Sequence, residues 1–423
     1  MTRFQIITLF IFGFIGVGGV LAFSGLLDHR INSSSGSIEI WGTLPEAQIN
    51  YNFDQLLVDK TINFSVKYHG FSDSTFDRSL IEALASGRGP DAILLSQDLI
   101  AHYLDKIYVI PAASYPARQV YDTFTDEARL FVINQGLLGL PLVVDPIVAY
   151  YNKDMFARAG IASFPKTWDT LIPLVPQLTI KDGKSGIMQS AVALGGYANV
   201  TNAKDIVASL LLQSGDDISK WTPDGRISPG LSQSAPGALS FFTQFSDPTL
   251  NIYAWNSALD SSRSMFEASK LAVYFGRASE YDDIRNKNPH LNFDVAVMPQ
   301  RADAVAPAVY GKMYAFAVLL GSQNTNSAFT AGSILSSAPV LKGIAESARL
   351  SPARRDLLTE GTTDPTLTIF NRSALIARGW LDPNPAGSNQ IFKDAIEGML
   401  SGQSKDTDAA NYMSGSLKNL LSN

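Results

Sequence analysis

Cysteine is absent from this 423-residue chain, and histidine is scarce, with only four residues. The lack of cysteine excludes disulfides, thiol nucleophiles and cysteine-ligated metals. The histidines are His29, His69, His102 and His290. Their spacing does not match metal-binding motifs such as HExxH. We therefore expect no metal centre and no cofactor.

Charge is also sparse, because only 17% of the residues are Asp, Glu, Lys or Arg. The 33 basic and 39 acidic residues leave a net charge of −6 and form no basic cluster, which argues against a nucleic-acid partner. A hydrophobic content of 46% is typical of a folded globular protein. The chain is too long for one ordinary core, so we expect two lobes.

The N-terminus carries the longest apolar run. After Met1-Thr2-Arg3, residues 4–27 contain no charge, and about 20 apolar residues suffice to cross a bilayer. We expect residues 1–30 to be a transmembrane anchor followed by a Ser/Gly linker at 31–37, with the body on the extracytoplasmic face of the membrane. The alternative is a signal peptide cleaved near Ala22-Phe23-Ser24, which would leave a secreted or periplasmic protein.

The first part of the body has an alternating β-α-β pattern. Apolar residues alternate over 37–41 and again over 62–68, which predicts two half-buried strands with a helix between them. A helix is predicted over 72–87, where apolar residues recur every fourth position and Gly87 provides a stop. A short apolar run at 92–95 predicts a third strand. This order is typical of a mainly parallel sheet flanked by helices.

Polar residues follow two of these strands. Trp41 and Thr43 stand at the end of the first, and Gln97 and Asp98 follow the third directly. Ligands of open α/β sheets bind beyond the carboxyl ends of strands, so these residues are candidates for ligand contact. The alternative is that they merely cap the next helices.

A second lobe is predicted to begin at LPLVVDPIVAYYNKDMFARAGIASFPKTWDTL. Residues 140–144 are apolar, Asp145-Pro146 is expected to break this strand, and 147–151 resumes it. Asn152 is a helix N-cap candidate and Gly160 a helix stop. Asp145 has no such structural explanation.

The helix that follows has its own start and stop signals. Thr167 is expected to cap it, and Pro173 is expected to kink or shorten it.

Four stretches together resemble the extracellular solute-binding proteins of bacterial ABC importers, of the maltose-binding-like, family 1 type. They are YYNKDMFARAGI with FPKTWDTL, EALASGRGPDAILLSQD, MFEASKLAVYFGRASEY and LNFDVAVMPQR. The resemblance implies a two-lobed periplasmic-binding-protein-like fold of type II, with a ligand cleft between the lobes. It covers nearly all of residues 38–423.

The family's chain crosses between the lobes three times. We place these crossings near Asp145, between Met298 and Tyr310, and near Leu350. Lobe 1 is then predicted to comprise 38–144 plus 305–350, and lobe 2 to comprise 145–304 plus 351–423.

The resemblance also implies ligand contacts. Gln97 and Asp98 match a polar pair that reaches sugar hydroxyls, Asp145 matches a carboxylate beside the first crossing, and Tyr197 matches an aromatic lining the cleft. Carboxylates suit vicinal hydroxyls or ammonium groups because they accept several hydrogen bonds.

Two aromatic platforms of maltose-type members are missing here. One position carries Gly276-Arg277-Ala278-Ser279 and the other falls near Asn389, which argues against long oligosaccharides. Arg277, with Ser279 beside it, is a candidate that pairs with Asp98 or Asp145 or faces an anionic ligand group, unless it is a solvated surface residue. Tyr310 is a further candidate, and we expect it, Lys312 or Tyr314 to reach the cleft.

The sequence therefore predicts a non-enzymatic binding protein that captures a small polar solute, a carbohydrate by preference, and delivers it to the transmembrane subunits of an ABC permease. A surface receptor with the same fold is one alternative. An exported glycoside hydrolase using Asp98 and Asp145 is another, although no further catalytic motif accompanies them.

Overall fold

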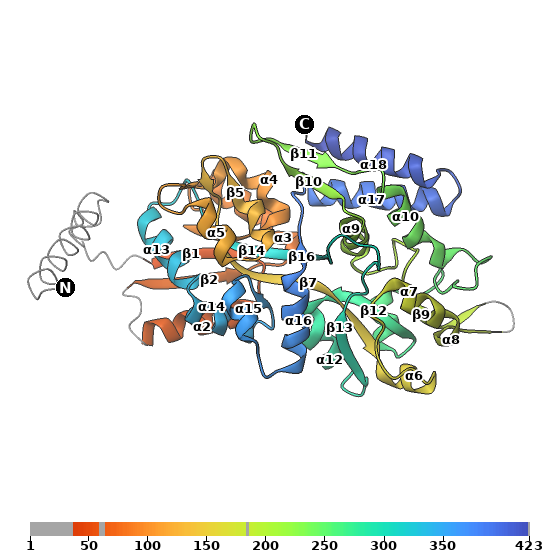
Figure 1. The fold of residues 1–423 in the computed structure, drawn as a ribbon. Coiled ribbons are helices and arrows are strands. Elements are labelled where there is room, and N and C mark those ends of the chain that lie inside the picture. The colour runs from red at the N-terminus through yellow and green to blue at the C-terminus, as the bar shows by residue number, and fades with distance from the viewer. Residues whose placement is uncertain (1–36, 59–63, 183–185, 422–423) are drawn as a thin grey trace, which may run out of the picture.

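The computed structural model describes residues 37–58, 64–182 and 186–421 (Figure 1). Its first elements confirm the predicted β-α-β pattern, which gives β1 (Ser37–Gly42), α2 (Glu46–Val58), β2 (Ser65–Gly70), α3 (Asp73–Ala85) and β3 (Ala92–Ser96). β1 pairs in parallel with both β2 and β3. The carboxyl ends of the three strands therefore lie at one edge of the sheet.

The remaining elements follow in chain order, with short 3-10 helices written η. Up to the first crossing they are η1 (Gln97–Leu99), α4 (Ile100–Tyr103), η2 (Leu104–Lys106), β4 (Ile110–Pro111), α5 (Ala117–Thr123), η3 (Asp126–Phe131), β5 (Val132–Ile133), β6 (Gly136–Leu137) and β7 (Leu140–Asn152). Next come α6 (Lys153–Arg158), α7 (Trp168–Leu171), η4 (Ile172–Leu174), α8 (Val175–Leu178), β8 (Ile180–Lys181), β9 (Ile187–Val192), α9 (Ala203–Gln213), β10 (Asp217–Trp221), β11 (Ile227–Gly230), α10 (Ala235–Thr243), η5 (Gln244–Ser246), α11 (Ser262–Glu267), β12 (Leu271–Arg277), η6 (Ala278–Glu280), α12 (Tyr281–Lys287) and β13 (Phe293–Val297). The last are β14 (Val309–Val318), α13 (Thr325–Leu335), α14 (Ala338–Ser347), β15 (Ser351–Pro352), α15 (Arg355–Glu360), α16 (Pro365–Leu375), β16 (Ala377–Arg378), α17 (Pro385–Leu400) and α18 (Asp406–Leu420).

One sheet runs through the whole molecule, in the order β2-β1-β3-β14-β7-β12-β9-β8. The outer pairs β1·β2, β1·β3 and β9·β12 are parallel, whereas β14 and β7 pair antiparallel with each other and with their neighbours β3 and β12. The lobes are thus mixed α/β, with the antiparallel strands concentrated where the chain crosses between them.

The expected break at Asp145-Pro146 is wrong, because β7 runs unbroken for 13 residues. Residues 140–146 of this strand pair with β14, and 147–152 pair with β12 and β13. Proline cannot donate to a ladder, but neighbouring residues on both sides of Pro146 keep the strand paired. β7 therefore belongs to both halves of the sheet.

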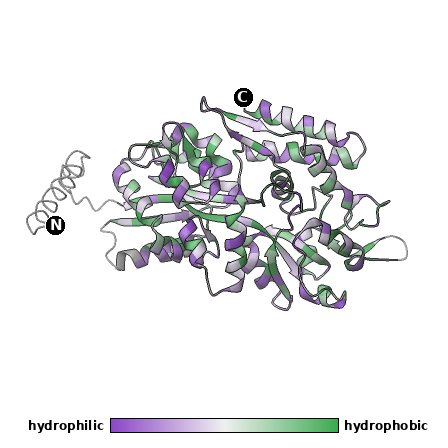
Figure 2. Ribbon diagram, viewed as in Figure 1, coloured by the Kyte–Doolittle hydropathy of each residue, from purple (hydrophilic) through white to green (hydrophobic). Residues whose placement is uncertain are grey.

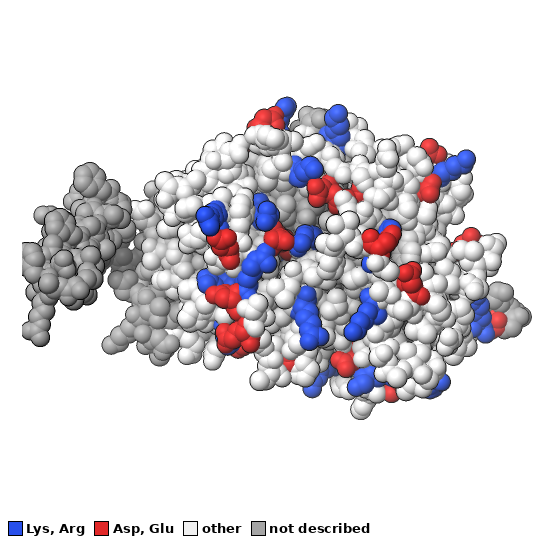
Figure 3. All heavy atoms as spheres, in the orientation of Figure 1, with Lys and Arg blue, Asp and Glu red and all other residues white. Residues whose placement is uncertain are grey.

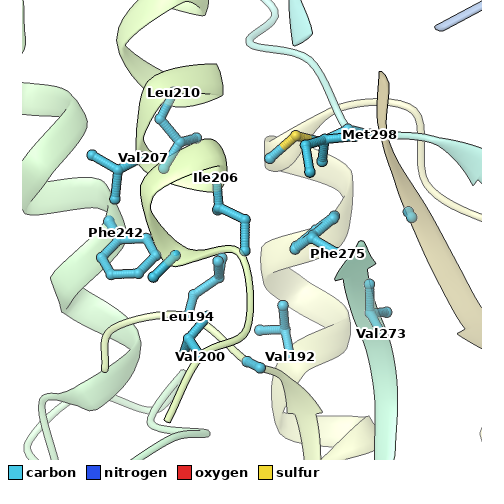
Figure 4. Packing of buried hydrophobic residues seen from close by; sticks show 14 of the residues in the cluster. Val192, Leu194, Val200, Ile206, Val207, Leu210, Phe242, Val273, Phe275 and Met298 are labelled. Carbon is cyan, nitrogen blue, oxygen red and sulfur yellow. The ribbon is translucent and has the colours of Figure 1, made fainter. Parts of the chain in front are cut away.

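Two hydrophobic cores flank this shared region and define the lobes used below. The core of lobe 1 runs from Ile38 to Val144, resumes from Met313 to Leu358, and also takes in Ala374, Ala377 and Leu381. The core of lobe 2 begins at Ile147 and includes the residues drawn in Figure 4, where α9 packs against the ends of β9 and β12. Figure 2 shows apolar residues along the crossing strand β7 and a mixture of hydrophilic and hydrophobic residues on the outer helices.

Along the chain, the switch from one hydrophobic core to the other does not coincide with the predicted lobe boundaries after 304 and 350. Val309 and Tyr310 still belong to the core of lobe 2, and 353–358 still contribute to the core of lobe 1. The reason is that β14 enters from lobe 2 before it reaches lobe 1, and that β15 pairs with the lobe 1 part of β7.

Local helix signals are confirmed. Asn152 accepts a hydrogen bond from the Met155 N–H at 3.0 Å and so caps α6, and Gly160 has a φ of +70° beyond its end. Thr167 stands at the N-cap of α7. Near Pro173 the helix is shortened as expected, because α7 gives way to the 3-10 turn η4 before α8 begins.

A hairpin of lobe 2, β10–β11, reaches across to lobe 1 (Figure 1). The Trp221 indole N–H donates to the Leu130 carbonyl at 2.9 Å, and the Asn134 side-chain amide donates to the Pro223 carbonyl at 3.0 Å. Trp221 and Ile227 also pack against the core of lobe 1. The lobes are therefore joined by this contact as well as by the crossing strands.

The expected membrane anchor at 1–30 and linker at 31–37 lie outside the described residues, except for Ser37. Among the helices that the structure describes, none has the length and apolarity needed to span a bilayer.

Candidate functional site

The crossing strands β14 and β7 form the floor of the predicted ligand site. Residues two apart on a strand share a face, so Tyr310, Lys312 and Tyr314 of β14 lie on the same side of the sheet. Lys312 stands directly opposite Asp145 of β7 in the ladder, and such paired residues also share a face. The predicted carboxylate at the first crossing is thus placed beside the three predicted β14 side chains.

Lys312 is buried, with 6% of its surface exposed, and its ammonium lies 3.4 Å from Asp98 Oδ2. A second carboxylate, Asp73, lies 3.9 Å from the same nitrogen. Burial opposes ionisation of Asp98 more strongly than any single neighbour favours it. The charge of Lys312, a hydrogen bond from Ser96 and the charges of Lys204 and Arg277 together outweigh burial and hold the pKa of the Asp98 carboxyl below its ordinary value. The pair is therefore ionised and removed from water.

Two buried polar atoms at the edge of the site have no hydrogen-bond partner among the described residues. They are Asp98 Oδ1, an acceptor, and Trp41 Nε1, a donor. Trp41 lies at the end of β1 and Asp98 just after β3, and these strands are parallel neighbours. Buried polar groups are nearly always paired, so two orphaned groups at adjacent strand ends indicate a place where a ligand completes the hydrogen bonding.

Asp145 is bound to the other lobe. Its Oδ1 accepts from the Ser279 N–H at 2.9 Å and its Oδ2 accepts from the Ser279 hydroxyl at 2.6 Å. Burial raises the pKa of the Asp145 carboxyl, while the charge of Arg277 and the Ser279 hydrogen bonds oppose that rise. Two predicted site residues, Asp145 and Ser279, therefore meet.

Arg277 pairs with neither Asp98 nor Asp145, so both of those predicted ion pairs are wrong in this structure. Its guanidinium binds Asp205 Oδ2 through Nε at 2.9 Å and Nη2 at 2.6 Å. Only 23% of the arginine side chain is exposed, which also excludes a solvated surface residue. Asp205 sits in the first turn of α9 and was not anticipated from the sequence.

A further buried ion pair was missed entirely. The Lys204 ammonium lies 2.7 Å from Asp382 Oδ2 and donates to the Ser388 hydroxyl at 3.1 Å. It also lies 5.6 Å from the centre of the Trp380 ring, within cation–π range. The positive charges of Lys204 and Arg277, from lobe 2, both act on Asp98. No sequence signal could pair residues this far apart in the chain.

The remaining candidates have mixed roles. Gln97 is fully buried, and all the hydrogen bonds of its side-chain amide go to β14. It donates to the Tyr310 hydroxyl and the Gly311 carbonyl and accepts from the Met313 N–H. It holds β14 in place and has no donor left for a ligand. Thr43 is half-buried just after β1.

Tyr197 reaches the second missing platform position. Its hydroxyl donates to Asn389 Oδ1 at 2.8 Å, and 7% of its surface is exposed. Gly195, two residues earlier, has a φ of +104°, and a β-carbon there would lie 2.3 Å from the Ser246 hydroxyl oxygen. This close turn sets the position of the tyrosine.

In the part of the chain that the structure describes, no group of three His, Cys, Asp or Glu side chains is arranged to hold a metal ion. The polar groups gathered here can bind hydroxyl and charged groups of a solute through direct hydrogen bonds.

Comparison with known sequences gives a family. The model of the bacterial extracellular solute-binding proteins matches residues 50–330. Chains of Brucella abortus (strain 2308) and Brucella suis biovar 1 (strain 1330) that carry the name of a binding protein are 22% identical over 209 residues. That match covers 47% of this chain and 46% of the relatives, so the chain aligns with about half of their length.

Solved structures share the fold over nearly the whole chain. A cyclo/maltodextrin-binding protein bound to maltotetraose superposes with a TM-score of 0.73 at 16% identity, covering 92% of this chain and 98% of its own. The GacH receptor of Streptomyces glaucescens gives 0.70 at 17% identity, covering 92% and 99%. The cyclic α-maltosyl-1,6-maltose binding protein of Arthrobacter globiformis gives 0.74 at 16%, covering 91% and 99%.

The architecture is therefore the two-lobed, mixed α/β fold of maltodextrin-binding proteins, as the sequence predicted. Together with the family model, which covers well over half of the residues, this fold shows that the chain belongs to the bacterial extracellular solute-binding proteins of ABC importers, family 1.

Proposed function

We propose that this protein captures a small carbohydrate between its lobes, at the site formed by Trp41, Asp98, Asp145, Arg277 and Lys312. The observation that carries the proposal is the orphaned pair of buried groups, the Trp41 donor and the Asp98 acceptor. A sugar hydroxyl is both a donor and an acceptor, so the hydroxyls of one sugar can supply partners for both groups. The solved relatives with the same fold, bound to maltotetraose or acarbose, support a sugar as the solute.

The proposed ligand is short. The positions expected to carry aromatic platforms hold Arg277, which is fixed by Asp205, and Asn389, which is fixed by Tyr197. Neither offers a flat apolar face for a sugar ring. A mono- or disaccharide held by charged and amide groups fits this lining better than a long oligosaccharide.

Capture is proposed to proceed by lobe closure. A ligand stabilises the closed arrangement only by contacting both lobes. Trp41 and Asp98 belong to lobe 1 and Arg277 to lobe 2, while β7 and β14 supply the strands about which a hinge motion turns. A solute bridging these groups therefore favours the closed form.

Delivery to an ABC permease is part of the proposal and is supported by the family alone. The family also supports an extracytoplasmic location. There the apolar N-terminal segment would anchor the chain to the membrane. Co-purification of the protein with a two-subunit permease from membranes would test delivery. A partner that is a signalling protein instead would favour the receptor alternative.

The sharpest test of the site is Trp41→Phe, which keeps the ring and removes only the N–H donor. Calorimetry against a panel of mono- and disaccharides first identifies the best ligand. The variant is then expected to bind it about fivefold more weakly, because one hydrogen bond contributes about 1 kcal/mol. Unchanged affinity would remove Trp41 from the site.

Trp168→Phe is the matched control. Its indole N–H donates to Gln213 inside lobe 2 at 2.8 Å, so the change should lower stability and leave sugar affinity unaltered. Asp145→Ala is a second probe of the site, expected to weaken binding by about 1–3 kcal/mol through loss of a buried acceptor. If no sugar, polyol, amino acid or polyamine produces a response, solute capture is contradicted.

A further inference from the structure

A second cavity lies on the other face of β14. It has a volume of about 600 Å³ and is bounded by lobe 1 at η3, by lobe 2 at the end of α9 and at β10, and by the loop 301–308. Tyr310 and Lys312 face the sugar site, whereas Gly311 between them faces Glu127, which lines this cavity. We call it the rear cavity; it shares no residue with the sugar site proposed above.

Glu127 lies at the base of the rear cavity with 2% of its surface exposed, and neither of its carboxylate oxygens has a hydrogen-bond partner among the described residues. The Met313 N–H nearby already donates to Gln97 Oε1 at 2.7 Å. A β-carbon at Gly311 would lie 2.9 Å from Glu127 Oε2, and one at Gly379 would lie 2.5 Å from Oε1. Two glycines thus leave room for a carboxyl group that forms no ion pair with the described residues.

Other acidic groups around the rear cavity have partners within the protein: the buried Asp216 carboxylate accepts hydrogen bonds from the Ser232 N–H and the Ser234 hydroxyl. Lys220 pairs with Asp217 at 3.1 Å and Arg301 with Asp303 at 2.8 Å. Figure 3 shows basic and acidic side chains mixed across the middle of this face, around a hollow. The charged side chains at the exposed edge of the cavity therefore neutralise one another. Glu127 differs from them because it has no such partner among the described residues.

Arg378 is the basic residue whose charge acts on Glu127, but its guanidinium forms its contacts with other groups. It binds Asp126 Oδ2 at 2.9 Å and the Ala377 carbonyl at 2.9 Å. Burial raises the pKa of the Glu127 carboxyl well above its ordinary range, and the charge of Arg378 and the nearby Met313 N–H only partly oppose this rise. A buried carboxyl of this kind is stabilised by any cation that can reach it.

We propose that the rear cavity is a second binding site, for a small organic cation with a primary ammonium or guanidinium group on a short aliphatic chain. The cationic group pairs with the Glu127 carboxylate. The chain lies along the apolar part of the lining, which Leu130, Leu212 and Pro307 supply. A volume of about 600 Å³ is within the range of small-molecule sites.

The test uses the purified full-length chain and n-butylammonium as the probe, with 1-butanol as its neutral counterpart. Titration calorimetry at about pH 8, where alkylamines are cationic, should show saturable binding of n-butylammonium and none of 1-butanol. Glu127→Gln should weaken binding at least tenfold. Asp217→Asn, at the exposed mouth of the same cavity, should change it less than twofold.

Equal binding of both probes, or unchanged binding to Glu127→Gln, would overturn the proposal. Ala306→Trp provides a second variant, because this exposed lining residue can narrow the cavity without touching the buried carboxyl. It too should weaken binding while circular dichroism shows an intact fold. Trp41→Phe should leave n-butylammonium affinity unaltered, so failure at this cavity is distinguishable from failure at the sugar site.

Discussion

The two faces of β14 treat buried charge in opposite ways. On one face, Lys312 is buried against Asp98, and Lys204 and Arg277 each have a carboxylate within 2.7 Å. On the other face, Glu127 is still more deeply buried, and its carboxylate oxygens have no hydrogen-bond partner among the described residues. A strand places alternate residues on opposite sides, so one short segment separates a compensated site from an uncompensated one. Where buried charges are paired, the protein supplies its own counter-charges. Where a buried charged group has no such partner, a ligand can supply the counter-charge.

The largest expected effect comes from breaking the compensated face. Asp98→Ala leaves the Lys312 ammonium buried, with Asp73 at 3.9 Å as its remaining carboxylate partner among the described residues. Removing one partner of a buried pair costs about 3–5 kcal/mol, and we expect a loss of that size in the free energy of unfolding in urea. Replacing both partners, by Asp98→Leu with Lys312→Met, should recover most of it. A loss below about 1 kcal/mol would show that the pair is effectively solvated.

The next effect concerns pH and the uncompensated face. Because burial raises the pKa of Glu127 in the folded protein, the unfolded chain releases this proton first as pH rises. Stability from this group is complete below the unfolded pKa. It then falls by about 1.4 kcal/mol per pH unit until the folded pKa is reached.

Glu127→Gln removes that component, so the variant should lose less stability than the wild type between mildly acidic and neutral pH. Burial also raises the pKa of Asp145 and Asp382, so part of the slope should persist in the variant. Urea unfolding at several pH values measures both slopes. Parallel curves for the two proteins would mean that Glu127 does not titrate differently on folding.

A smaller effect is expected at the hairpin that closes the rear cavity. Trp221→Phe removes the hydrogen bond to the Leu130 carbonyl and should cost about 1 kcal/mol. Hydrogen exchange should show faster opening of η3, which carries Leu130. Trp255→Phe, which loses a comparable bond to Asn199 within lobe 2, should leave exchange in η3 unchanged.

The smallest effect is expected at the mouth of the rear cavity. Lys220 and Asp217 are 3.1 Å apart, but their side chains are 62% and 65% exposed. Surface pairs of this kind contribute little, so Lys220→Ala should change the free energy of unfolding by less than about 0.5 kcal/mol. A larger change would place this pair in a more buried environment than its exposure indicates.

Local features were the part of the structure that the sequence predicted well. The three N-terminal strands, the Asn152 cap and the effect of Pro173 depend on residues close together in the chain, and all are confirmed. The resemblance to the family added the two-lobed fold, which solved structures share. The break predicted at Asp145-Pro146 failed because pairing with β14, β12 and β13 overrides the local preference of proline.

Contacts between distant residues could not be predicted. Asp98, Asp145, Arg277, Ser279 and Tyr310 were named from strand ends and family positions, but Asp205 and Asp382 were not. Their partnership with Arg277 and Lys204 arises only when separate elements pack together. The same holds for Glu127, whose missing partner becomes visible only in three dimensions.

The continuity of β7 has a practical consequence for dividing the protein. At about 3.3 Å per residue this 13-residue strand extends roughly 43 Å. Its first half pairs with β14 and its second half with β12 and β13, so one strand contributes hydrogen bonds to the sheets of both lobes. A fragment ending at 144 would present bare amides and carbonyls along the middle of its sheet, the kind of edge that recruits other chains. Neither half should be expected to stay soluble by itself, and the lobes are best regarded as mechanical parts of one folding unit.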